Sequence, residues 1–153
     1  MNQVKLIFPP IGTLITNEMA LQLSQSLGLQ NVVNEILGGS NLYRSWYFDG
    51  VSGLHDSLMG FIGNGYNVTY QCALPHDLAY GYGKLGDKLG RKHADHQFRE
   101  NLIHKANVHP FNAYLCWLAV RILGTEKLGL SFTWGFANAN RKSLIDRPIK
   151  WTY

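Results

Sequence analysis

The residues best suited to chemistry form a short constellation in the middle of the chain. His76 and Asp77 are adjacent, Tyr80 follows one helical turn later, and Asp95 stands about a helix length further on. Residues four apart share a helix face, so His76 and Tyr80 lie together, whereas Asp77 points about 100° away from the histidine. A pair arranged in this way serves two neighbouring sites, with the histidine as a base and the aspartate as a cation ligand.

Asp95 completes the arrangement if the two helices that carry these residues pack antiparallel. Its carboxylate can then accept a hydrogen bond from one ring nitrogen of His76, which fixes the tautomer and leaves the other nitrogen to activate water. The hydroxyl of Tyr80 can donate to the same carboxylate. The sequence therefore predicts a catalytic group made of His76, Tyr80 and Asp95.

Asp77 alone makes a poor cation site, because calcium takes about six to eight oxygen ligands, many of them backbone carbonyls. Glycine-rich loops supply such ligands, since their carbonyls can turn inward without Cβ clashes. Two upstream runs have this composition, at residues 49–53 and 60–65. The residues alone thus predict a calcium site at Asp77 and leave both loops open as its second half.

Apolar spacing and terminal signals predict a mainly α-helical chain. The expected helices span residues 17–27, 31–37, 68–82 or 75–82, 91–106 and 111–123. Thr16 or Asn17 is expected to cap the first helix, and Gly28 to end it. Pro75 favours the later start of the third helix, because proline suits the first helical position. The last helix is apolar almost all round and is expected to be buried.

The stretches between these helices carry further signals. Residues 40–67 are rich in Gly, Asn, Asp and Ser and are predicted to form a long loop, which in a compact domain is usually functional. Its aromatic side chains suit either an interfacial lipid-binding rim or the core; they are Trp46, Tyr47, Phe48, Phe61 and Tyr66. After Gly124, partial alternation of apolar residues indicates a strand or an extended arm.

Composition limits the class of protein. The 153 residues fit one domain (1–153), and 46% hydrophobic against 16% charged residues exclude a disordered chain. The net charge of +4 favours an anionic partner such as lipid head groups or nucleic acid. The chain has no basic tail or arm, and the expected partner is lipid and not nucleic acid. The glycine-rich run at 81–90 lacks the strand context of a phosphate loop, so no nucleotide role is expected. Nothing in the residues indicates an oligomeric state.

Apolar runs and cysteines bear on where in the cell the protein is expected. No apolar run reaches the ~18 residues of a transmembrane segment, and the N-terminus lacks a signal-peptide pattern. Cys72 and Cys116 are expected to be reduced and packed, although a bridge between them is sterically conceivable. We therefore expect a cytoplasmic protein, or one exported without a visible signal, that acts peripherally at membranes.

Several short motifs, taken in order, resemble the secreted phospholipase A2 superfamily. The likeness is greatest to its small prokaryotic and fungal members and to their bacterial relatives, and it covers residues 49–136. The motifs are Asp49-Gly50-Val51-Ser52, then His76-Asp77-x-x-Tyr80 preceded by Cys72, then Ala94-Asp95-x-x-Phe98, Val120-Arg121-x-x-Gly124 and Phe132-x-Trp134-Gly135-Phe136. The first and second correspond to the calcium loop and the catalytic helix of that superfamily.

The resemblance implies a fold, a reaction and a role for each residue. The fold would be mainly α, with two antiparallel core helices and a calcium-loop segment. His76 would be the general base, oriented by Asp95, in hydrolysis of the sn-2 ester of glycerophospholipids at a bilayer or micelle surface. Calcium would be held by Asp77 and by the backbone carbonyls of Asp49 and Gly50, because the 49–53 loop has the spacing of the prokaryotic members.

Two departures from the family pattern and two alternatives remain. Val51 replaces the loop cysteine and Ala79 replaces another cysteine of animal members, so the loop is either held by packing or loose until lipid or metal binds. One alternative function is a non-catalytic lipid- or partner-binding protein with the same scaffold. The other is a zinc site in which His93 and His96 join His76 and Asp77, although the chain has no zinc-site signature.

Overall fold

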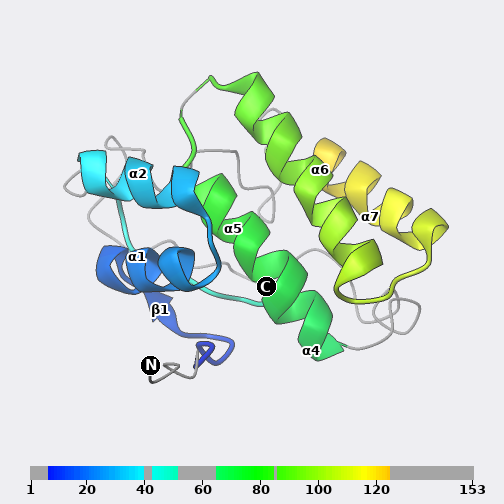
Figure 1. Ribbon diagram of the computed structural model, residues 1–153, viewed down its shortest axis with the longest axis horizontal. Helices are drawn as coiled ribbons and strands as arrows, with labels where there is room; N and C mark the ends of the chain where they lie inside the picture. The colour runs from blue at the N-terminus through cyan, green and yellow to red at the C-terminus, as the bar shows by residue number, and fades with distance from the viewer. Residues whose placement is uncertain (1–6, 40–42, 52–64, 85, 125–153) are drawn as a thin grey trace.

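The computed structural model describes residues 7–39, 43–51, 65–84 and 86–124, and it is mainly helical, as predicted (Figure 1). The elements are β1 (Leu14–Ile15), α1 (Asn17–Ser26), α2 (Gln30–Gly39), β2 (Trp46–Tyr47), α4 (Gly65–Asn67), the π-helix η2 (Val68–Ala73), α5 (Leu74–Gly81), α6 (Lys88–His104) and α7 (Pro110–Leu123). Most of the alternative loop at 60–65 and the motif at 132–136 lie outside the described residues.

The first helix begins and ends where the sequence predicts. The Thr16 hydroxyl accepts the Met19 amide at 3.2 Å, which satisfies one of the unpaired donors of the first turn of α1. Gly28 follows the helix with φ of 71°, a conformation that glycine adopts without a Cβ clash. These two residues fix the length of α1 and let the chain turn into α2.

Residues 40–67 are not a single loop, which corrects that prediction. Ile15 pairs with Trp46 and Leu14 with Tyr47 in an antiparallel two-stranded sheet, and α4 begins at Gly65. Trp46 is buried and its indole nitrogen donates to the Tyr82 hydroxyl at 3.3 Å, so it belongs to the core and not to an exposed rim. Of the expected rim aromatics that the structure describes, Phe48 is also buried and Tyr66 is exposed.

The central helix is longer than predicted, since α4, η2 and α5 follow one another without a break from Gly65 to Gly81. Pro75 lies inside it, where it has no amide to donate and its ring crowds the carbonyl four residues earlier. The preceding segment is wound as a π-helix, in which the Leu74 amide donates to the Thr69 carbonyl five residues back. The wider turn accommodates the proline, and therefore neither predicted start, 68 or 75, is correct.

Two hydrophobic clusters flank this helix. The first cluster joins α1, α2 and the small sheet to α5 through Leu74, Leu78 and Tyr82. The second cluster joins η2 to α6 and α7 and includes Val68, Cys72, Phe98, Leu102, Ala113 and Cys116. The central helix therefore has apolar neighbours on two sides, and it holds its polar residues at a fixed position between them.

Helices α6 and α7 pack against each other, and α6 also packs along the central helix (Figure 1). Helix α6 starts three residues earlier than predicted because Asp87 caps it, accepting the Gly90 amide at 2.8 Å. The prediction that α7 is buried is wrong for its outer face. Five of its apolar side chains are exposed: Phe111, Tyr114, Leu115, Leu118 and Ile122.

Candidate active site

The three predicted catalytic residues meet between α5 and α6. The two helices run in opposite directions (Figure 1), and His76 Nε2 lies 3.0 Å from Asp95 Oδ1. The Tyr80 hydroxyl donates to the same oxygen. Asp95 is completely buried, His76 and Tyr80 nearly so. The predicted antiparallel packing and the predicted partners of Asp95 are confirmed.

Asp95 is held as a carboxylate by the donors around it. Burial alone would raise its pKa, but the hydrogen bonds from His76, Tyr80 and Arg121 outweigh burial and lower it. An ionised carboxylate can only accept, so the Nε2 nitrogen of His76 must carry the proton in this hydrogen bond. The lone pair of the neutral ring is then on Nδ1, and this nitrogen is the one able to take a proton.

Ring contacts and nearby charges set the state of the histidine. The imidazole centroid lies 4.3 Å from the Tyr80 ring and 4.9 Å from the Phe98 ring, so packing restricts its rotation. Burial lowers the pKa of His76, but the carboxylates of Asp77 and Asp95 outweigh it, and the pKa is raised. His76 is therefore a buried, oriented group with increased basicity, which suits proton transfer.

Arg121 of α7 also reaches this site, and the sequence-based prediction missed it as a site residue. Its Nη1 donates to Asp95 Oδ2 at 2.7 Å, and Arg91 Nε lies 3.9 Å from the same oxygen. The contact joins residues 26 apart in the chain, which no local pattern reveals. One signal was available, because Arg121 is the only charged residue in the otherwise apolar segment 110–123.

Asp77 lies beside the histidine in a position that suits a cation. Its Oδ1 is 3.8 Å from His76 Nδ1, while its Oδ2 is buried and has no hydrogen-bond partner in the described part of the chain. Burial raises the pKa of Asp77 to about 7; His76 opposes this rise, and the charge of Asp49 adds to it. Buried polar atoms are almost always paired, so this carboxylate requires either a proton or a cation.

The 49–51 segment meets part of the requirement for a calcium loop. Gly50 is buried with φ of 77°, and a Cβ there would lie 3.0 Å from Ile11 Cδ1. Val51 packs against the second cluster, so packing holds this segment. Asp49 is close enough to Asp77 to act on its charge. The carboxylates of Asp49 and Asp77, together with the unpaired Oδ2 of Asp77, fit a hard divalent cation.

The remaining ligands would have to be backbone carbonyls or water. Within residues 7–39, 43–51, 65–84 and 86–124, the structure has no group of three or more His, Cys, Asp or Glu side chains that could hold a metal ion. His93 and His96 are both exposed on α6.

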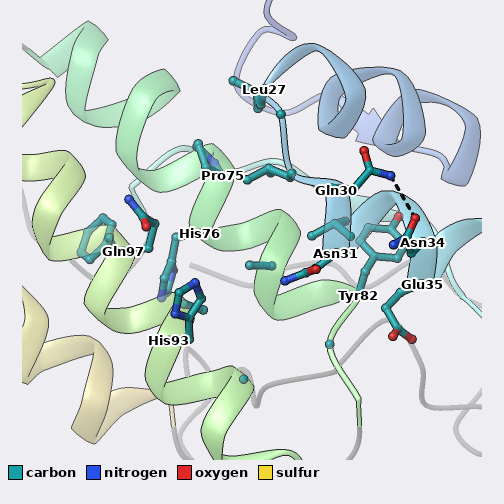
Figure 2. A pocket seen from close by; sticks show the side chains of 18 of the residues that line it. Leu27, Gln30, Asn31, Asn34, Glu35, Pro75, His76, Tyr82, His93 and Gln97 are labelled. Atoms are coloured by element: carbon teal, nitrogen blue, oxygen red, sulfur yellow. Dashed lines mark hydrogen bonds between the residues drawn. The ribbon is translucent and has the colours of Figure 1, made fainter.

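A cavity of about 720 Å³ opens beside His76, between α2 on one side and α5 and α6 on the other (Figure 2). Amide side chains stand on both walls: Gln30 donates to Asn34 at 2.9 Å on α2, and Gln97 donates to Asn101 at 3.2 Å on α6. Asp77 is not among the lining residues. The histidine therefore borders a space large enough for a substrate.

Two other findings concern the described chain. Cys72 and Cys116 are both buried and free, as expected. None of the described helices combines the length and the apolar character that crossing a membrane requires. In comparisons with known proteins, no family model, curated protein or solved structure matches the chain.

Proposed function

We propose that this protein is a calcium-dependent esterase of phospholipase A2 type, which cleaves the sn-2 ester of glycerophospholipids at a membrane surface. The observation that carries the proposal is the buried hydrogen bond from His76 to Asp95, which directs the basic Nδ1 nitrogen away from Asp95. The motifs that resemble the phospholipase A2 superfamily supply the substrate class. The orphaned oxygen of Asp77 supports the choice of cofactor.

In the proposed reaction, water attacks the ester carbonyl carbon while His76 Nδ1 takes one of its protons. Asp95 stabilises the imidazolium that forms, and the Tyr80 hydroxyl keeps the carboxylate oriented. When the tetrahedral intermediate collapses, the same proton passes from Nδ1 to the departing alcohol oxygen. A calcium ion held by Asp77, with backbone carbonyls of Asp49 and Gly50, would supply electrostatic stabilisation of the oxyanion.

The second candidate is a non-catalytic protein that uses the same scaffold to bind lipid or a partner. The exposed apolar face of α7 favours it, because exposed apolar surface is typical of interaction sites. The side chains of this face are exposed, whereas His76, Tyr80 and Asp95 are buried between α5 and α6, so the face is not part of the proposed hydrolytic site. The two functions differ in one respect: hydrolysis of lipid requires His76, whereas binding of lipid does not.

The decisive experiment measures fatty-acid release from mixed anionic phospholipid vesicles, with calcium and with excess chelator. We expect release by the wild type with calcium only, and loss of release in His76→Gln, which nearly preserves the side-chain volume. His104→Gln is the matched control, because that histidine is exposed at the end of α6 and pairs with Glu100. Folded wild-type protein that releases no fatty acid, or a fully active His76→Gln variant, would overturn the proposal.

A further inference from the structure

Helix α7 makes a second set of contacts with the site, besides the hydrogen bond from Arg121 to Asp95. Arg91 Nη2 donates to the Arg121 backbone carbonyl at 2.6 Å, and Arg91 Nε donates to the Tyr80 hydroxyl at 3.2 Å. Arg91 is thus anchored to the last turn of α7 at one end of its guanidinium and to the candidate site at the other. The two arginines together tie α7 to Asp95 and to Tyr80.

The end of α7 also comes unusually close to Tyr80. A Cβ on Gly124 would lie 3.0 Å from the Tyr80 hydroxyl oxygen and 2.6 Å from the Val120 carbonyl oxygen. Glycine is therefore required at position 124, where the end of α7 contacts Tyr80. This contact is independent of the arginines and places the same end of α7 against the same site.

The geometry shows what Arg121 does for Asp95. His76 and Tyr80 both use Oδ1, and Arg121 binds Oδ2. A carboxylate bound through only one oxygen can rotate about χ2, which is a broad torsion. An arginine on the second oxygen removes this freedom, and it also balances a charge that is completely shielded from solvent.

We propose that Arg121 is a positioning residue for His76: by fixing the second oxygen of Asp95, it sets the direction of the imidazole and makes α7 a structural part of the active site. The inference rests on the proposed function, in that the histidine is taken to be the base. Arg121 does not line the cavity described above, so it acts through Asp95 and not on substrate. Its loss should therefore affect turnover more than substrate binding.

The kinetic test compares Arg121→Met with Arg99→Met. The two arginine side chains are equally exposed, at 31%, and each donates to a carboxylate, but Arg99 binds Glu100 on the outside of α6. We expect Arg121→Met to lower kcat roughly 10- to 100-fold with KM little changed, because a small misplacement of a catalytic group has effects of this size. Arg121→Lys, which keeps the charge, should recover part of the loss, and Arg99→Met should behave as wild type.

A readout that does not need turnover separates this inference from the proposed function. The His76 Nε2 proton, bonded to a buried carboxylate, should give a slowly exchanging downfield resonance in the proton NMR spectrum, identified by its absence in His76→Gln. We expect Arg121→Met to shift or broaden this signal and Arg99→Met to leave it unchanged. If Arg121→Met does not fold, Arg121→Gln is judged by the same two criteria.

The outcomes are distinct. A wild type without hydrolytic activity, in which the resonance still depends on Arg121, would refute the proposed function and leave the positioning role standing. An active wild type, with Arg121→Met matching Arg99→Met in both kcat and resonance, would overturn the positioning role. Loss of kcat with an altered resonance and partial recovery in Arg121→Lys would establish it.

Discussion

Replacing Asp95 by asparagine tests the core of the site with almost no change in shape. The wild-type carboxylate accepts from three side chains, those of His76, Tyr80 and Arg121. An amide has one accepting oxygen and one NH₂ group, so in Asp95→Asn the NH₂ group must face a donor. With its oxygen toward Arg121, the amide would donate to His76 Nε2, which moves the ring proton to Nδ1 and removes the base.

The expected loss of folding stability in Asp95→Asn follows from burial. Removing one partner of a buried ion pair costs about 3–5 kcal/mol. Asp95 is completely buried, but the Arg121 side chain is 31% exposed and can regain water, so we expect the lower end, about 3 kcal/mol. The loss of activity should be roughly 10,000-fold in kcat, which is the effect of the wrong tautomer in a serine protease triad.

The assays are urea unfolding followed by circular dichroism, and fatty-acid release from vesicles. Because hydrogen bonds lower the folded-state pKa of Asp95, its contribution to stability is present above the unfolded pKa and is lost as pH falls through the lower, folded value. Wild-type stability should therefore fall more steeply than that of Asp95→Asn below about pH 4. A variant destabilised by under about 1 kcal/mol, or with equal acid sensitivity, would refute the reasoning.

Three further predictions follow from other contacts. Burial and Asp49 raise the pKa of Asp77 to about 7, so at pH 8.5 without metal this carboxylate is ionised and destabilises the folded state. Under these conditions Asp77→Asn should unfold at a higher urea concentration than the wild type. Added calcium should not stabilise this variant. Gly124→Ala should lose about 1–3 kcal/mol through contact with Tyr80, whereas Gly38→Ala, with open space around it, should be neutral or stabilising in thermal unfolding. Burial raises the pKa of Cys72 to about 12, and we expect this thiol to react with Ellman's reagent only after denaturation; fast reaction in native protein would contradict the packing.

Local signals were enough to predict α1 and the central contact. Thr16 begins α1 through its side-chain cap and Gly28 ends it through its positive φ, and the spacing of His76 and Tyr80 placed both on one face toward Asp95. Such features depend on residues within a few positions of one another. Only the antiparallel packing of α5 and α6 had to be assumed, and a short connection between them makes it the natural arrangement.

The missed features have physical reasons. Strands of two residues, such as Trp46–Tyr47, are too short to show alternation, so their region was predicted as loop. Gly90 hid the true start of α6, because glycine usually marks a break and here receives the cap from Asp87. Arg121 was missed because its partner lies on another helix, and α7 was wrongly expected to be buried because hydrophobicity alone does not distinguish an exposed apolar face.

The π-helix η2 links the length of the central helix to the proline inside it. A π-helical turn amounts to one extra residue inserted into an α-helix, and its wider winding takes up that residue while the α-helical parts on either side keep nearly the same facing. Deleting one residue from Val68–Ala73 would let the segment rewind as α-helix, with Leu74 and Leu78 still toward the first cluster and His76 still toward Asp95. Pro75 would then crowd the carbonyl four residues before it, with no wider turn to relieve the contact. We therefore expect the deletion to be tolerated only when Pro75 is replaced as well, so that in the history of such a chain the insertion and the proline were gained, or would be lost, together.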